Sequence, residues 1–187
     1  LAVTAFAAAD LAVGNVERLR VYVRSGLLDA VLVRPLGVLV QLTALDVAPR
    51  RVGRLLFGIA MLVVAVVHAH VPLTARSLVL LALTPAPGAV IFGAVFVATA
   101  AVAFWWIESG EIANGLTYGG LNFTQYPITI YGPALRRMFA YAVGFAFVAY
   151  YPALLILGRP DPLGGPSWLG WCAPAVVAVA GAIAWAL

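Results

Sequence analysis

Residues 25–36 read SGLLDAVLVRPL, and they lie in the middle of a basic segment that separates two apolar blocks. This segment, residues 17–54, carries seven of the eleven basic residues of the chain, and all eleven are arginine. Arginine and lysine in the loops between membrane helices favour the cytoplasmic side of a bilayer. We therefore expect 17–54 to be a cytoplasmic loop between two membrane-spanning helices.

The apolar side chains of this stretch recur at the spacing of one helix face: Leu27, Leu28, Val31 and Leu32. Ser25 is a candidate N-cap for such a helix, and Pro35 ends or kinks it. Asp29 and Arg34 then lie near its two ends. Two interpretations fit the pattern, which are a helix lying on the membrane surface and a lever that docks in a soluble partner.

The composition points to a membrane protein. Of the 187 residues, 64% are hydrophobic and 10% are charged, and the mean hydropathy is +1.05. A soluble domain has roughly 25% charged residues, so the bilayer is the better solvent for this chain. The arginines flank apolar segments instead of clustering on one polar domain, which argues against nucleic-acid binding. A single cysteine, Cys172, excludes an internal disulfide and a cysteine-based metal cluster.

The sequence predicts an all-α integral membrane protein, a polytopic helical bundle with one transmembrane domain over residues 1–187. The candidate spans are 1–16, 55–71, 88–107, 138–157 and 175–187. The first of these is too short to cross a bilayer, which takes about 20 residues. Because the chain also begins without methionine, we expect an N-terminal truncation with one or more spans missing.

Alternation of these spans assigns the loops to two sides of the membrane. Loops 17–54 and 108–137 fall on one side and together carry nine arginines, whereas Arg76 and Arg159 fall on the other. This asymmetry makes the first side cytoplasmic. Prolines interrupt the other side, and irregular backbone at membrane depth needs cover from protein or water. We expect residues 151–174 to form a re-entrant hairpin in the outer leaflet. The residues that we assign to this hairpin are Tyr151, Pro152, Trp168 and Trp171.

Few residues suggest chemistry. His68 and His70 lie two apart, on different faces of a helix, and zinc needs three or four ligands. Asp10 lies inside an apolar run, where a carboxylate costs free energy and usually faces a cavity or a partner. Glu108 and Glu111 share one helical face, which suits either a solvated helix end or acid–base work. The chain has no nucleotide-binding, metalloprotease or serine-hydrolase motif.

Several short motifs lie in a fixed order along the chain: RSGLLD at 24–29, LVRPL at 32–36, FWW at 104–106, FTQYPITIYG at 123–132, YYPA at 150–153, LGR at 157–159 and WLGWCAP at 168–174. In this order they resemble the permease subunit of a bacterial type-2 ABC exporter, from a branch linked to drug and viologen efflux. The resemblance covers nearly the whole chain.

The resemblance implies six spans per permease, of which the first and most of the second are missing here. It implies that residues 25–34 are a coupling helix that docks in a groove of a separate ABC ATPase. The implied ATPase-coupling residues are Ser25, Gly26, Leu27, Leu28, Asp29, Val31, Leu32, Arg34 and Pro35. It also implies two permease chains, alike or different, paired with two ATPase subunits in the lipid of the bacterial plasma membrane. This chain then holds no cofactor, and ATP and Mg bind the ATPase.

An exporter of this kind moves hydrophobic or amphipathic compounds, such as drugs, toxins or lipids, out of the cell. Phe92, Phe96 and Phe145 are apolar candidates for the substrate path, although they suit a lipid-facing role equally well. Two alternatives remain open at this point. One is an intramembrane lipid-modifying enzyme that uses Asp10, Glu108 and Glu111, and the other is a membrane scaffold that transports nothing.

Overall fold

The computed structural model describes residues 1–44, 48–102, 105–106 and 110–186, and within these ranges the chain forms helices and no strand. The longer elements are α1 (Ala2–Val13), α2 (Leu19–Ser25), α3 (Leu28–Leu32), α4 (Val38–Ala44), α5 (Pro49–His68), α6 (Ala75–Leu83), α7 (Pro85–Ala101), α8 (Gly110–Gln125), α9 (Pro133–Leu135), α10 (Tyr150–Leu157) and α11 (Ala173–Ala186).

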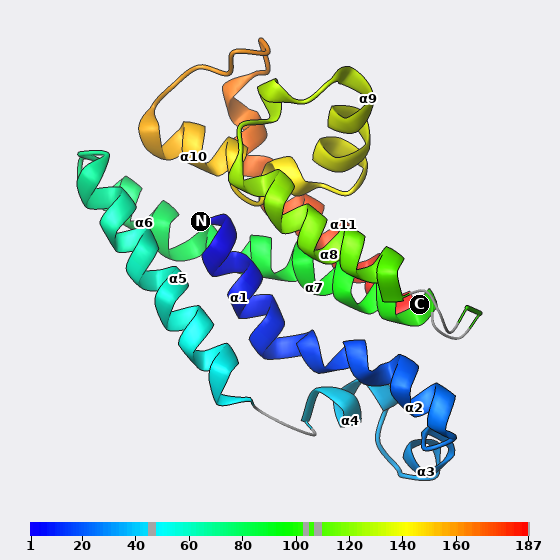
Figure 1. Ribbon diagram of the computed structural model, residues 1–187. Coiled ribbons are helices and arrows are strands. Elements are labelled where there is room, and N and C mark those ends of the chain that lie inside the picture. The colour runs from blue at the N-terminus through cyan, green and yellow to red at the C-terminus, as the bar shows by residue number, and fades with distance from the viewer. Residues whose placement is uncertain (45–47, 103–104, 107–109, 187) are drawn as a thin grey trace.

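The long helices form a bundle around α1 and α7. Helix α7 packs against α1, α8 and α11, and α5 packs against the outer side of α1. Figure 1 shows α2, α3 and α4 at one end of this bundle, whereas α9 and α10 lie at the other end. We call the end that carries α2–α4 the coupling end. The opposite end holds the N-terminus of α1 and the connection from α5 to α6 (Figure 1).

Among the residues that the structure describes, two helices are long and apolar enough to cross a membrane: Pro49–His68 and Ser77–Ala101. A third crossing results if Pro133–Ala142 and Phe145–Leu157 count as one bent span. The predicted all-α membrane class is therefore confirmed. Helix α5 begins at Pro49, six residues before the start of the predicted span at residue 55. A proline fits the first turn of a helix, because the amide hydrogens there have no partner within the helix.

The prolines at 85 and 87 do not break the helix that contains them, which runs over Ser77–Ala101. Thr84 has right-handed helical angles, and α6 continues through it into α7. Its hydroxyl donates to the carbonyl of Leu80. Pro85, at the first position of α7, has no amide hydrogen to donate to the preceding turn, and α6 and α7 nevertheless run on as one long helix.

The largest departure from the sequence prediction concerns helix α8. The sequence predicts that residues 108–137 lie on the same side of the membrane as loop 17–54. Helix α8 instead runs back along α7 and brings residues 128–147 to the end opposite α2–α4 (Figure 1). Gly120 permits this close packing, because a Cβ there would collide with the Phe145 ring. Arg136 and Arg137 consequently leave the coupling end. Seven of the eleven arginines remain there, so the positive-inside asymmetry persists.

The predicted span 138–157 is bent in the structure. The segment Pro133–Ala142, which ends in a π-helical turn, meets the segment Phe145–Leu157 at an angle of 68°. Gly144 sits at the bend with φ +87°, a left-handed conformation that strongly favours glycine. A straight helix is incompatible with that angle, so this stretch is a broken or re-entrant segment.

Residues 151–174 fold back on themselves. Helix α10 ends at Gly158, which has φ +63°, and a 3₁₀ helix, Ser167–Cys172, packs against α10. Tyr151 and Pro152 are buried, whereas Trp168 and Trp171 are exposed. The segment thus has the hairpin shape expected from its prolines, and its depth in the outer leaflet stays a prediction.

Candidate coupling element and its anchoring cluster

The coupling element begins as an extension of α1. The chain continues from α1 through a 3₁₀ helix, Gly14–Arg18, directly into α2. Helix α2 ends because Gly26 adopts φ +72°, the left-handed C-cap conformation. The Ser25 hydroxyl donates to the Val21 carbonyl at 2.7 Å, one turn back in the same helix. The predicted N-cap role of Ser25 is therefore wrong, because Ser25 closes α2 and does not open α3.

Helix α3 is short and divides the predicted apolar face in two. Val31 is buried and Leu28 is partly buried against the protein. Leu27 and Leu32 are instead 53% and 59% exposed. The loop that follows adds two more exposed apolar side chains, Val33 and Leu36. We call Leu27, Leu32, Val33 and Leu36 the tip patch.

Charged residues surround the tip patch. Arg24, Asp29 and Arg34 are all exposed on the same segment, and Pro35 ends the turn after α3. An exposed apolar patch with a charged rim is typical of a protein or membrane interaction site. Because the segment lies at an end of the bundle, beyond the membrane-spanning helices, the patch has access to a partner outside the bilayer (Figure 1).

Gln41 holds the tip in place, and sequence analysis did not single it out. It lies on α4 and is buried. Its Nε2 donates to the carbonyl oxygens of Val31 at 3.0 Å and Leu36 at 2.5 Å. The two bonds tie the end of α3 and the following loop to α4. The sequence feature that could have identified Gln41 is its position as a single amide side chain in the apolar run of α4, VLVQLTA.

An apolar cluster seats the coupling element on the bundle. Val16, Leu19 and Leu42 are buried against Ala100, which lies at the end of α7. Leu28 of α3 packs at the edge of this cluster. The segment before α3 therefore contacts the end of a membrane-spanning helix, and α4 packs against that segment.

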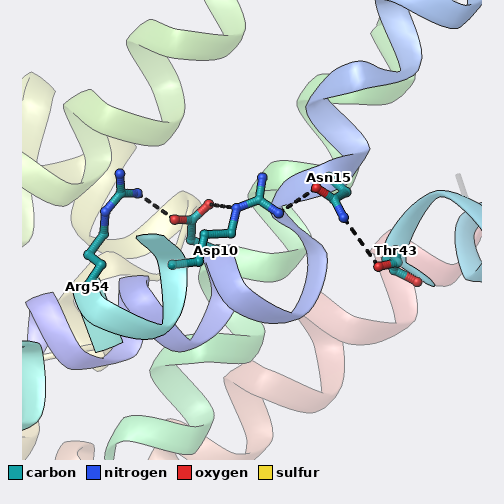
Figure 2. Close-up of polar contacts among 5 residues, drawn as sticks. Asp10, Asn15, Thr43 and Arg54 are labelled. Carbon is teal, nitrogen blue, oxygen red and sulfur yellow. Dashed lines mark hydrogen bonds and ion pairs between the residues drawn. The ribbon is translucent and has the colours of Figure 1, made fainter. Parts of the chain in front are cut away.

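A polar cluster adjoins this seat (Figure 2). Asp10 of α1 is 3% exposed and forms ion pairs with Arg51 Nε at 3.2 Å and Arg54 Nη1 at 2.5 Å, both on α5. Arg51 Nη1 also donates to Asn15 Oδ1 at 2.5 Å. Asn15 Nδ2 in turn donates to the Thr43 carbonyl of α4 at 3.4 Å. We call Asp10, Asn15, Arg51 and Arg54 the anchoring cluster.

The sequence predicted that Asp10 faces a cavity or a partner, and the structure gives it two partners that the sequence did not identify, Arg51 and Arg54. The next carboxyl along the chain, Glu17, feels the same surroundings. Burial raises the pKa of the Glu17 carboxyl, and the negative charge of Asp10 adds to this effect. The nearby guanidinium groups, Arg51 foremost, act in the opposite direction.

The three phenylalanines predicted for the substrate path form part of the core. Phe92, Phe96 and Phe145 are each at most 1% exposed. Phe92 packs edge-on against Phe6 at 5.2 Å between ring centroids and lies 5.4 Å from Phe145. A substrate reaches none of them in this conformation. An open apolar groove of about 420 Å³ lies instead between α7 and α11, beside the bend at Gly144.

The remaining candidates lie apart. His68 ends α5 and His70 follows it, both exposed. Glu111 is exposed in the first turn of α8, and Glu108 lies outside the described residues. Across the part of the chain that the structure describes, no three His, Cys, Asp or Glu side chains gather as a metal site would require.

Comparison with known proteins agrees with this architecture. Residues 2–187 match the family described as ABC-2 family transporter protein. No curated protein and no solved structure matches the chain. The predicted resemblance to a type-2 ABC permease is thereby confirmed. Members of this family are the membrane components of transporters that associate with ABC ATPase subunits, and they are not catalytic themselves. The chain belongs to the ABC-2 family of transporter proteins, as a membrane permease component.

Proposed function

We propose that this chain is the permease subunit of an ATP-driven exporter in the bacterial plasma membrane and that its tip patch docks on the ABC ATPase. The tip patch carries the proposal. Its apolar side chains are exposed at the arginine-rich end of the bundle, where the positive-inside asymmetry predicts the cytoplasm. ATP and Mg bind the ATPase, and this chain contributes the membrane path.

The size and shape of the tip suit a groove in a protein partner. Leu27 directly precedes the short helix α3, Leu32 ends it and Val33 follows it, and Val33 is 85% exposed. Apolar side chains in consecutive helical turns are the usual anchors when a helix docks in a groove. Arg24 and Arg34 at the rim favour acidic side chains on the partner.

The mechanism follows from how the tip is held. ATP binding brings the ATPase subunits together and displaces the tip. Gln41 ties α3 to α4, and the apolar seat ties both to the end of α7, so the displacement reaches the membrane-spanning helices. A movement driven in this way needs contacts that differ in free energy between the two states of the transporter.

We assign the substrate class from the groove between α7 and α11. Its lining is almost entirely aliphatic, with Tyr141 as the polar side chain: Ile91, Ala94, Val95, Ala98, Tyr141, Ala142, Val143, Gly144, Ala175, Val176, Val179, Ala180 and Ile183. Such a surface suits hydrophobic or amphipathic compounds, including drugs and lipids. In the apolar stretch of helix α5, only 11% of the residues are buried. The other apolar side chains are available to lipid or to a second permease chain.

The lipid-modifying enzyme is a weaker interpretation of the same residues. The carboxylate of Asp10 is occupied by ion pairs with two arginines, and Glu111 is exposed instead of lining an enclosed reaction site. A scaffold without transport remains an outcome of the experiment that follows.

The experiment charges the tip patch. Leu27→Glu combined with Leu32→Glu places two carboxylates in the proposed contact, whereas Leu73→Glu charges another exposed leucine at the opposite end of the bundle. The full-length protein is purified from its native membrane in mild detergent, and bound subunits are identified by mass spectrometry. We expect the ATPase to be lost from the double variant and kept by Leu73→Glu. An ATPase retained by the double variant, with unchanged ATP-dependent transport, would reject the proposal.

A further inference from the structure

The anchoring cluster joins three parts of the chain that are distant in sequence. Asp10 and Asn15 come from α1 and its 3₁₀ extension, and the Thr43 carbonyl comes from α4 (Figure 2). Arg51, which contacts both Asp10 and Asn15, comes from α5. The family match does not assign a role to these residues. Their burial and mutual contacts call for one, because buried ionic groups cost free energy unless they are fully paired.

The central ion pair is enclosed and tightly fitted. The side chains of Asp10 and Arg51 are 5% and 8% exposed, whereas that of Arg54 is 41% exposed. Gly14 lies directly beneath the pair, and a Cβ on it would collide with Asp10 Oδ1 and lie 3.2 Å from Arg51 Cζ. The guanidinium of Arg51 therefore rests against bare backbone, where its position is defined on several sides.

Polar contacts and one short helix connect the tip to α5. Gln41 binds the Val31 and Leu36 carbonyls, and α4 carries both Gln41 and Thr43. From the Thr43 carbonyl the contacts continue through Asn15 to Arg51. One short helix and a row of hydrogen bonds thus connect the proposed ATPase contact to the first turn of a membrane-spanning helix.

A second contact holds α5 against α1 further along the bundle. The Thr4 hydroxyl donates to the Gly58 carbonyl at 2.9 Å, and a Cβ on Gly58 would press on the backbone of Thr4. Two separate contacts between the same helices restrict both sliding and rotation. Movement of the anchoring cluster therefore carries α1 and α5 together.

We infer that Asp10, Asn15 and Arg51 are positioning residues that lock α4 and the first turn of α5 to α1, so that displacement of the tip moves both helices. This inference rests on the proposed function for its consequence in transport. It goes beyond that function by assigning how the movement reaches α5. Asn15 is the bridge in this arrangement, because it alone in the described cluster contacts both Arg51 and α4.

The test uses Asn15→Ala in the full-length protein with its native ATPase. The substitution removes the bridge and leaves the Asp10–Arg51 ion pair in place. We expect ATPase binding to be retained and transport per ATP hydrolysed to fall by about tenfold, the size of a lost hydrogen bond to a charged group. Amide hydrogen exchange over residues 38–44 should accelerate by a similar factor. Arg50→Gln, an exposed neighbour on α5, serves as the control and should change neither quantity.

Arg51→Lys provides a second variant that keeps the charge. Lysine pairs with Asp10 but lacks the planar fork that reaches Asn15 at the same time. It should therefore reproduce the faster exchange of Asn15→Ala while the protein stays folded. The inference is overturned if both variants leave exchange over 38–44 and transport per ATP unchanged. If the wild-type protein binds no ATPase, the proposed function fails, and the exchange measurement still decides whether the cluster locks α4 to α1 and α5.

Discussion

The N-terminal half of α1 is held by aromatic rings, whereas its C-terminal end is held by charges. Phe6 packs among Phe92 and Phe96 of α7 and Tyr118 of α8. A few residues further on, Asp10 is buried between arginines of α5. Ring packing gives stability through area and shape, and its loss is partial when one ring is removed. Loss of one partner of a buried ion pair is more costly, because the other partner is then left buried and unpaired.

The charged end should therefore be the more sensitive of the two. Asp10→Ala leaves Arg51 buried without its carboxylate, and the free energy of unfolding should fall by about 3–5 kcal/mol. Unfolding in mixed micelles measures the change. The control Asp29→Ala removes an exposed carboxylate from α3 and should have an effect within about 0.5 kcal/mol. Equal stabilities of the two variants would contradict the account of the anchoring cluster.

The aromatic end should respond less. Phe92→Ala opens a cavity in the core, but lipid is as apolar as the core and the transfer contribution is small. We expect a loss of about 2–3 kcal/mol, below the range for soluble proteins. Phe57→Ala, which trims an exposed ring on α5, should be close to neutral. A loss for Phe92→Ala larger than that for Asp10→Ala, measured under the same conditions, would reverse the comparison.

Packing at the far side of the aromatic cluster can be tested with one methyl group. A Cβ on Gly120 would collide with Phe145, whereas a Cβ on Gly119 meets no atom within 4 Å. Gly120→Ala should destabilise the protein by about 1–2 kcal/mol through overpacking. Gly119→Ala should stabilise it slightly, because alanine is the better helix former. If both substitutions stabilise the protein, the close approach of α8 to Phe145 is wrong.

The smallest effect concerns pH at the charged end. The folded state raises the pKa of Glu17 above its ordinary value near 4.5, so the folded protein binds this proton more tightly than the unfolded chain. Stability attributable to Glu17 is then present at low pH and falls as pH rises through the window above 4.5. Glu17→Gln should flatten that dependence in thermal unfolding in nanodiscs. An unchanged slope would exclude Glu17 from the response.

The sequence predicted the helical membrane class, the basic loop at 17–54 and a cavity or a partner for Asp10. These rest on composition and on the cost of a charge in an apolar run, which need no tertiary information. The role of α8 was missed because its Asn, Thr and Gly residues read as a polar loop, although Gly120 and Thr117 pack inside the bundle. Its identity as a packed helix depends on Phe145, a residue distant in sequence.

The candidate site likewise combines features that the sequence pattern predicts with features that depend on tertiary contacts. The apolar pattern identified residues 25–36, but which side chains face outward depends on Gly26 ending α2 and on Gln41 holding the turn. Phe92, Phe96 and Phe145 showed the opposite problem, since an aromatic residue in an apolar helix suits lipid, substrate or core equally well. Only the surrounding rings decide that these three belong to the core.

The docking of the tip patch is the central claim, and photo-crosslinking tests it most directly. A photoreactive amino acid replaces Val33, which is 85% exposed at the tip, and in a second variant replaces Leu73 at the opposite end of the bundle. Both variants of the full-length protein are irradiated in native membranes, and the products are identified by mass spectrometry. The account predicts a cross-link from position 33 to an ABC ATPase and none from position 73. Cross-links from position 33 to lipid alone would contradict it.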